Sequence, residues 1–174
     1  VTGKFWWTIA DDAGNTLQTD PQAFRVEDTA QSWKKVANNQ LAIYWYSGGD
    51  SFGKALFDRG IEAMNYLQQD TRVTVDRQVQ IFVYGDRTDF MNALAEGAKE
   101  WTGGQAFTEF SVILINIDPK SLEWGKSATV HELTHQVIAQ KIRSALGDLS
   151  MPRWMNEGLA MYYETYPGTL DSQF

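Results

Sequence analysis

Two histidines four residues apart, with a glutamate directly after the first, are the residues of this chain whose types and spacing could do chemistry. They form the segment HELTH, and His131 and His135 are the only histidines in the sequence. On a helix, residues four apart lie on one face, so both imidazoles can point at one metal ion. Glu132 is turned about 100° from His131, beside the ion, where it can take a proton from water. The spacing predicts a zinc site with Glu132 as general base.

The alternative interpretation is a solvated helix face that carries two histidines by chance. A random order of this composition would give both the spacing and the following glutamate in fewer than roughly one case in a thousand, counting this motif alone. The neighbouring residues Val130, Leu133 and Val137 are apolar, which is typical of a helix packed into a core. These observations favour the metal site.

The third ligand of such a site has to be a carboxylate, because the chain has no cysteine and no further histidine. Glu157 is the best candidate, since it lies among apolar residues in WMNEGLAMYY and a buried, unpaired carboxylate is costly unless it binds a cation. Gly158 and Ala160 would let its helix approach the HELTH helix closely. The alternative is a Glu157 on the helix surface. Three other carboxylates, Glu123, Asp148 and Glu164, fit less well. Asp148 or Glu164 could instead orient a histidine ring.

Length, charge and composition narrow the class of protein. The 174 residues suit one domain, or one domain with a small appendage. A net charge of −7 argues against binding to nucleic acid, and no stretch reaches the roughly 18 apolar residues of a membrane span. The sequence begins at Val1 without a signal-peptide pattern. We therefore expect a piece of a longer protein, with possible upstream and downstream domains.

The hydrophobic pattern predicts an α+β fold. Residues 1–40 are expected to form an N-terminal β hairpin or arm, or the end of an upstream domain, and residues 41–174 the main domain. Strands are expected at 41–46, 78–84 and 110–117, and helices at 51–70, 85–101, about 127–146 and 152–166. The two glycines at 103–104 are expected to break the second helix.

HELTH followed by WMNEGLAMY resembles the gluzincin metallopeptidases, and is most similar to the bacterial peptidase-MA-like group. The pattern of that group is HExxH and then W-x-x-E-G-x-A-x-Y on a following helix. The positions that fit the second segment are Trp154, Glu157, Gly158, Ala160 and Tyr162.

The resemblance implies a zincin-like fold, in which a mixed β-sheet precedes an active-site helix and a ligand-bearing helix follows. It also implies one Zn²⁺ bound by His131, His135 and Glu157, with Glu132 as general base and acid. The strand at 110–117 would be the sheet edge along which a peptide substrate lies extended.

The sequence departs from the best-known gluzincins in four places. Twenty-one residues separate His135 from Glu157, slightly more than in those enzymes. Met161 stands where thermolysin-like enzymes have an aspartate that holds a histidine. The G-x-M-E-N segment of aminopeptidases is absent, with GGQAF in its region, which favours an endopeptidase. We expect a full C-terminal lobe, which usually supplies a residue that stabilises the transition state, to be missing or very short. Side chains that could contact the substrate or transition state instead are Tyr162, Tyr163, Tyr166 and Asn156.

The sequence therefore predicts a zinc metallopeptidase that hydrolyses peptide bonds of a peptide or protein substrate with a metal-activated water. One alternative is a zinc-bearing domain that binds peptides or cell-wall material with little or no hydrolysis. A second is a glycan-binding module built on exposed tryptophans, since the chain has 7 Trp. Similarity to the group implies an extracytoplasmic location, as a secreted or membrane-anchored bacterial protein.

Overall fold

The computed structural model describes residues 2–25, 29–94, 103–146 and 151–165 of the chain. The chain forms two compact units, Val1–Ser32 and Trp33–Phe174. The sequence analysis places this division after residue 40. The observed division comes earlier, after Ser32, because strand β5 (Lys34–Ala37) pairs with a strand of the second unit.

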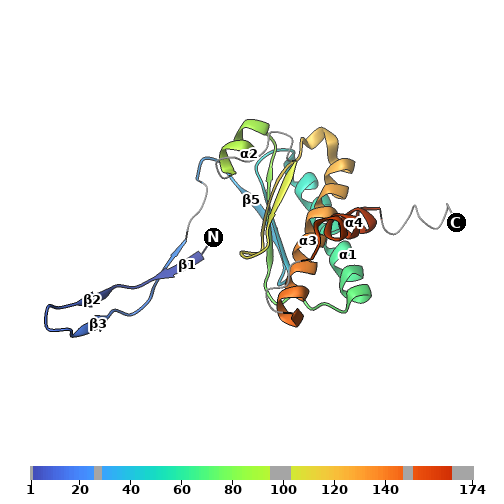
Figure 1. The fold of residues 1–174 in the computed structure, drawn as a ribbon. Coiled ribbons are helices and arrows are strands. Elements are labelled where there is room, and N and C mark those ends of the chain that lie inside the picture. The colour runs from blue at the N-terminus through green and yellow to red at the C-terminus, as the bar shows by residue number, and fades with distance from the viewer. Residues whose placement is uncertain (1, 26–28, 95–102, 147–150, 166–174) are drawn as a thin grey trace. The chain divides into compact units, whose positions relative to one another are not determined.

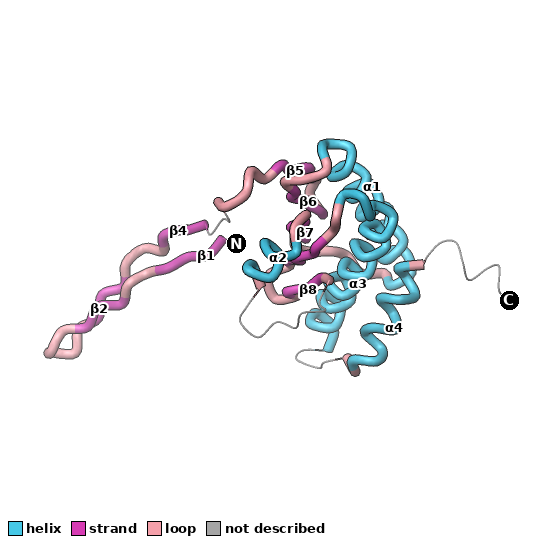
Figure 2. Tube along the Cα trace, turned by 90° about the horizontal axis from the view of Figure 1, so that it is seen from above, coloured by secondary structure: helices cyan, strands magenta, loops and turns pink. Residues whose placement is uncertain are grey.

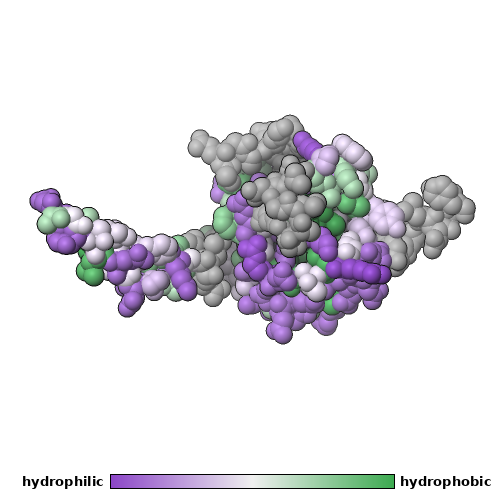
Figure 3. All heavy atoms as spheres, turned by 60° about the horizontal axis from the view of Figure 1, so that its bottom comes forward, coloured by the Kyte–Doolittle hydropathy of each residue, from purple (hydrophilic) through white to green (hydrophobic). Residues whose placement is uncertain are grey.

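The first unit is a β hairpin. β1 (Thr2–Phe5) pairs antiparallel with β4 (Gln22–Arg25), and β2 (Thr8–Ala10) pairs with β3 (Thr16–Gln18). The Asp11 carboxylate closes the turn by accepting the backbone N–H groups of Ala13 and Asn15 at 3.0 and 2.8 Å, which is the usual way an aspartate stabilises a turn. Large apolar side chains remain exposed along this hairpin, and hydrophobic atoms lie among hydrophilic ones on the face in Figure 3.

The second unit is built on a mixed five-stranded sheet with the order β5-β6-β7-β9-β8. The remaining strands are β6 (Leu41–Trp45), β7 (Val79–Tyr84), β8 (Gly104–Phe107) and β9 (Val112–Asn116). The three central strands β6, β7 and β9 run parallel, and the edge strands β5 and β8 run antiparallel to their neighbours. The α+β prediction is confirmed. The strand expected at 110–117 is β9, but it lies inside the sheet, so its expected place at the edge is wrong.

Helices cover both faces of this sheet. They are α1 (Gly49–Thr71), α2 (Arg87–Ala93), α3 (Leu122–Leu146) and α4 (Arg153–Glu164), with a 3₁₀ turn at Pro119–Ser121 before α3. Figures 1 and 2 show α1 and α3 side by side on one face, with α4 packed against α3, and α2 on the opposite face. The active-site helix is thus followed by the helix expected to carry the third ligand.

Two hydrophobic clusters hold these layers together. Alternate residues of a strand point to opposite faces, so Ile81 and Val83 of β7 pack toward α1 and α3, while Phe82 packs toward α2. Val130 and Leu133 of α3 are fully buried in the first cluster. Helix α3 is therefore fixed over the sheet, and the residues on its remaining face keep a defined position.

Two helix boundaries differ from the sequence prediction. Helix α3 begins at Leu122 instead of about 127, and Gly125 lies within it. A Cβ at Gly125 would lie 2.5 Å from Cγ2 of Ile117, so this glycine lets the helix pack closely on the chain that precedes it. Helix α2 covers the first half of the helix predicted at 85–101, and its second half lies outside the described residues.

Candidate metal centre

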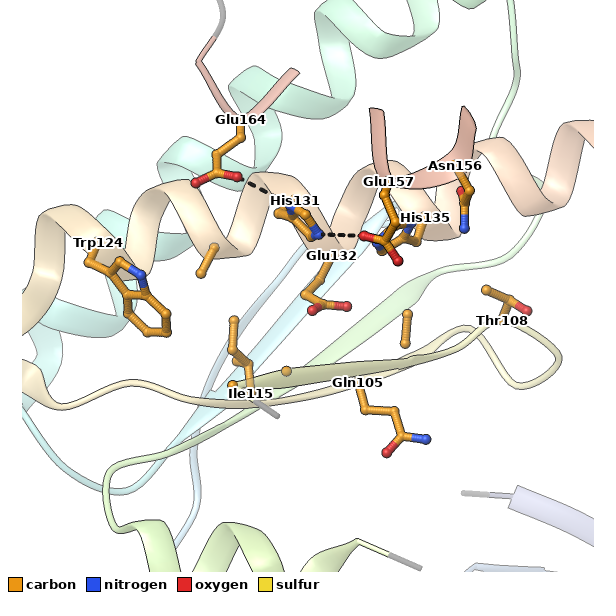
Figure 4. Close-up of a pocket in the computed structure, with 14 residues that line it drawn as sticks. Gln105, Thr108, Ile115, Trp124, His131, Glu132, His135, Asn156, Glu157 and Glu164 are labelled. Carbon is orange, nitrogen blue, oxygen red and sulfur yellow. Dashed lines mark hydrogen bonds and ion pairs between the residues drawn. The ribbon is translucent and has the colours of Figure 1, made fainter. Parts of the chain in front are cut away.

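Helices α3 and α4 bring His131, His135 and Glu157 together. One ligand atom from each lies within 4.8 Å of the others, and Figure 4 shows the three side chains pointing toward one another. Oε2 of Glu157 lies 3.5 Å from Nε2 of His131 and 3.7 Å from Nε2 of His135. A tetrahedral ion with bonds of about 2.0–2.2 Å holds its ligand atoms roughly 3.3–3.6 Å apart. The two distances from Glu157 are close to this range, and the three donors lie near enough to one another to bind a metal ion.

His131 is held from its other ring nitrogen by a second carboxylate. Nδ1 of His131 lies 3.1 Å from Oε2 of Glu164. Glu157 and Glu164 are seven residues, about two helical turns, apart on the same face of α4, so each can reach one nitrogen of the same ring. If Nδ1 carries the proton and donates it to Glu164, Nε2 keeps a free lone pair for a metal. Met161 has no carboxylate with which to hold a histidine, and Glu164 makes this contact instead. Asp148, the other carboxylate considered for it, lies outside the described residues.

His135 is more deeply placed. Its Nδ1 is buried and has no hydrogen-bond partner in the described part of the chain. Its Nε2 is the nitrogen that faces Glu157. Burial lowers the pKa of His135, and the Asn156 side chain and Glu157 partly offset this effect. A neutral imidazole is the form that binds a metal. The surroundings therefore keep His135 ready to act as a ligand without first losing a proton.

The surroundings of Glu157 differ from the sequence-based argument. Its side chain is 44% exposed, and the neighbouring Trp154 and Met161 are also exposed, so the carboxylate is not enclosed by apolar groups. A Cβ at Gly158 would meet nothing within 4 Å, so this glycine is not needed for helix packing. Ala160 is fully buried, as expected. Glu157 reaches the histidines because α4 lies across the face of α3 that carries them.

Glu132, which is on α3, lies beside the three candidate ligands. Burial raises the pKa of Glu132 to about 7, which His131 partly offsets and the negative charge of Glu157 reinforces. A carboxyl group that titrates near neutral pH can exchange a proton with a bound substrate. Its position and its pKa both suit a general base.

The centre opens into one pocket of about 610 Å³, a size typical of ligand sites. Figure 4 shows α3 on one side of this pocket and the sheet edge on the other. The lining residues are Gly103, Gly104, Gln105, Ala106, Thr108, Ile115, Trp124, Ala128, His131, Glu132, His135, Asn156, Glu157 and Glu164. The three candidate metal ligands and Glu132 therefore share one cavity.

Comparison with protein families decides what kind of domain carries this centre. The model of the Peptidase MA superfamily matches residues 59–174, more than half of the chain. The chain belongs to the Peptidase MA superfamily. Searches among curated proteins and among solved structures gave no match. Membership makes the second unit a peptidase-like enzyme domain of the Peptidase MA fold, with peptides as the implied substrates.

The tyrosines expected near the reaction do not line the pocket of this Peptidase MA domain. Tyr163 is buried in the main hydrophobic core, and Tyr162, whose ring stacks edge-on against it, is not among the lining residues. Tyr166 lies outside the described residues. Asn156 does line the pocket, beside His135. Of the four expected contact residues, the described structure places only Asn156 at the cavity.

Sequence reasoning missed the wall opposite α3 in this Peptidase MA domain. Strand β8 forms that wall, and its first residue Gly104 was interpreted only as the end of a helix. Trp124 was missed because α3 was expected to start after it. A glycine in a strand often marks a close approach of another group, so the pair at 103–104 was the available signal.

None of the helices in the described ranges is long and apolar enough to cross a membrane.

Proposed function

We propose that this chain is a zinc-dependent peptidase of gluzincin type, in which His131, His135 and Glu157 hold one Zn²⁺ and Glu132 is the general base. The observation that supports this most is the convergence of two Nε2 atoms and one carboxylate oxygen beside a half-buried glutamate, Glu132. Two imidazoles and a carboxylate are the ligand set of a catalytic zinc site, which keeps one position open for water or substrate.

When bound, zinc supplies Lewis acidity that polarises the scissile carbonyl and makes water a better nucleophile near neutral pH. Glu132 accepts the proton of the attacking water and then donates it to the leaving amine. Glu164 fixes the ring of His131 through Nδ1. Without the ion, burial raises the pKa of the Glu132 carboxyl to about 7, which brings its titration close to neutral pH.

In the described part of the second unit no strand pairs with the outer side of β8, which offers a place for the substrate backbone. The N–H of Asn116 donates to the C=O of Gly103 at 2.9 Å. In an antiparallel pair the hydrogen-bonding direction alternates from residue to residue, so Gly104 and Ala106 turn their N–H and C=O groups away from β9. An extended peptide can pair with these groups as an added strand. The substrate-binding edge is then β8, in place of the strand at 110–117.

The pocket favours cleavage within a chain over removal of its first residue. Every acidic residue that lines the cavity already serves the metal centre: Glu132, Glu157 and Glu164. An aminopeptidase must bind the charged amine of its substrate, and this part of the described structure has no spare carboxylate for it. We therefore infer an endopeptidase.

One end of the pocket is apolar. Trp124 and Ile115 lie there, on the side of the centre away from Asn156 and Thr108 (Figure 4). A cavity wall of this kind binds a large apolar side chain best, since burying apolar surface provides most of the affinity. We propose that peptides with a leucine or phenylalanine next to the cleaved bond are preferred.

The experiment that tests the function combines metal content with hydrolysis. The chain is loaded with zinc, its zinc content is measured, and cleavage of unfolded casein is compared with that by Glu132→Gln. One zinc per chain, hydrolysis by the wild type and its loss in the variant support a peptidase. Metal retained without hydrolysis in either form indicates the alternative, a zinc-bearing binding domain. Absence of bound metal contradicts both.

A further inference from the structure

Gly104 lies against the side chain of Glu132. It is the first residue of β8 and pairs with Ile115 of β9. A Cβ built on Gly104 would lie 2.5 Å from Oε1, 3.0 Å from Cδ and 3.1 Å from Cγ of Glu132. Real Cβ atoms do not approach another heavy atom as closely as 2.5 Å. Any other residue at position 104 would therefore force either the strand or the Glu132 side chain to move.

The backbone conformation gives no other reason for this glycine. Positive φ angles occur at Gly14, Gly48 and Gly49 among the described glycines, and not at Gly104. In a strand interior glycine is unfavourable compared with alanine, because it loses more conformational freedom on folding. The neighbouring Gly103 has room for a side chain, since its Cβ would meet Trp124 at ordinary contact distances of 3.6 and 3.7 Å.

Strand and helix are both fixed, so the carboxylate is the part that would yield. β8 is paired with β9 along its whole length, and α3 is anchored by fully buried side chains such as Leu133. The three atoms nearest to the added Cβ all belong to Glu132 and none to a metal ligand. A methyl group at position 104 would thus push the carboxylate away from its place and leave His131, His135 and Glu157 untouched.

We propose that Gly104 is a positioning residue for Glu132: the missing side chain leaves the room in which the general base stands beside the metal ligands. The inference rests on the proposed function, because it assigns Glu132 the role of base. Displacing a catalytic group by about 1 Å can cost on the order of 100-fold in rate. Position 104 then limits the reaction through the placement of Glu132 and without touching the metal.

The kinetic test compares Gly104→Ala with Gly158→Ala in the zinc-loaded chain. The second variant adds the same methyl group next to a metal ligand, at a site where it meets nothing within 4 Å. Gly104→Ala is expected to lower kcat by about 100-fold with zinc affinity changed less than twofold, and Gly158→Ala to keep the wild-type kcat. Combining Gly104→Ala with Glu132→Gln is expected to add no further loss. A wild-type kcat in Gly104→Ala, a parallel loss of zinc, or an added loss in the double variant would overturn the proposal.

A second measurement tests the packing even if the chain hydrolyses nothing. Urea unfolding of the metal-free protein is followed for Gly104→Ala, Glu132→Ala and the double variant. Gly104→Ala is expected to lower the unfolding midpoint when Glu132 is present and to raise it when Glu132→Ala has removed the crowded side chain. An equal shift in both backgrounds would contradict the inference. Loss of the proposed function alone would show as an inactive wild type with this sign change intact.

Discussion

The half-buried carboxyl group of Glu132 should make the metal-free protein less stable as the pH rises. Burial raises its pKa from the ordinary 4.5 to about 7. The folded chain therefore binds this proton more tightly than the unfolded chain does. The resulting stabilisation is fully present below pH 4.5 and is lost as the pH rises through 7. Each pH unit between the two values is worth about 1.4 kcal/mol, so the full effect is about 3 kcal/mol, of which some 2–3 kcal/mol falls between pH 5 and 8.

Glu132→Gln, which mimics the protonated acid, isolates this effect. Urea unfolding in the presence of a chelator, at pH 5 and pH 8, gives the stability difference between variant and wild type. We expect this difference to shift by about 2–3 kcal/mol in favour of the variant at the higher pH. Glu123→Gln is the matched control, because Glu123 lies on the same helix with a side chain 84% exposed. A variant whose advantage is the same at both pH values would refute the account of Glu132 as a half-buried base.

Three further predictions concern the metal and the pocket. Glu164→Gln should weaken zinc binding by about 10–100-fold, measured against a competing chelator, because the ring of His131 loses its charged partner; unchanged affinity would contradict this role. Zinc at about 100 times its dissociation constant should stabilise the wild type by about 2.7 kcal/mol in thermal unfolding, and His135→Ala should abolish this effect; an equal gain in the variant would place the ion elsewhere. Trp124→Ala should lower kcat/KM by about 10-fold or more for a peptide with leucine beside the cleaved bond. It should leave kcat/KM unchanged for the same peptide with alanine in place of that leucine. An equal loss for both peptides would argue against an apolar subsite.

The sequence was sufficient for the two helices of the centre and for the grouping of its three ligands. The histidines are tied together by helical spacing, which is a local property, and the absence of cysteine and other histidines limited the third ligand to a carboxylate. The choice of Glu157 agrees with the grouping in the structure, although the argument from burial was wrong, since its side chain is 44% exposed. The position of α4 across α3 decides the geometry, and no local pattern encodes it.

The sheet edges could not be predicted for the same reason. β5 and β8 are four-residue strands without a clear alternation of apolar and polar residues, and they exist because neighbouring strands offer unpaired hydrogen-bonding groups. That relation depends on residues far apart in sequence, such as Gly104 and Ile115. The closeness of Gly104 to Glu132 follows only once β8 and α3 are both in place. Tertiary contacts of this kind form the pocket wall.

The measurement that tests the central claim most directly is the number and affinity of zinc ions in the purified chain and in four variants. We predict one zinc per chain for the wild type and for Glu132→Gln, because Glu132 stands beside the ligands and is not one of them. Zinc should be lost, or bound at least 100-fold more weakly, in His131→Ala, His135→Ala and Glu157→Ala. A wild-type chain that binds no zinc, or a Glu157→Ala chain that binds it as tightly as the wild type, would contradict the account.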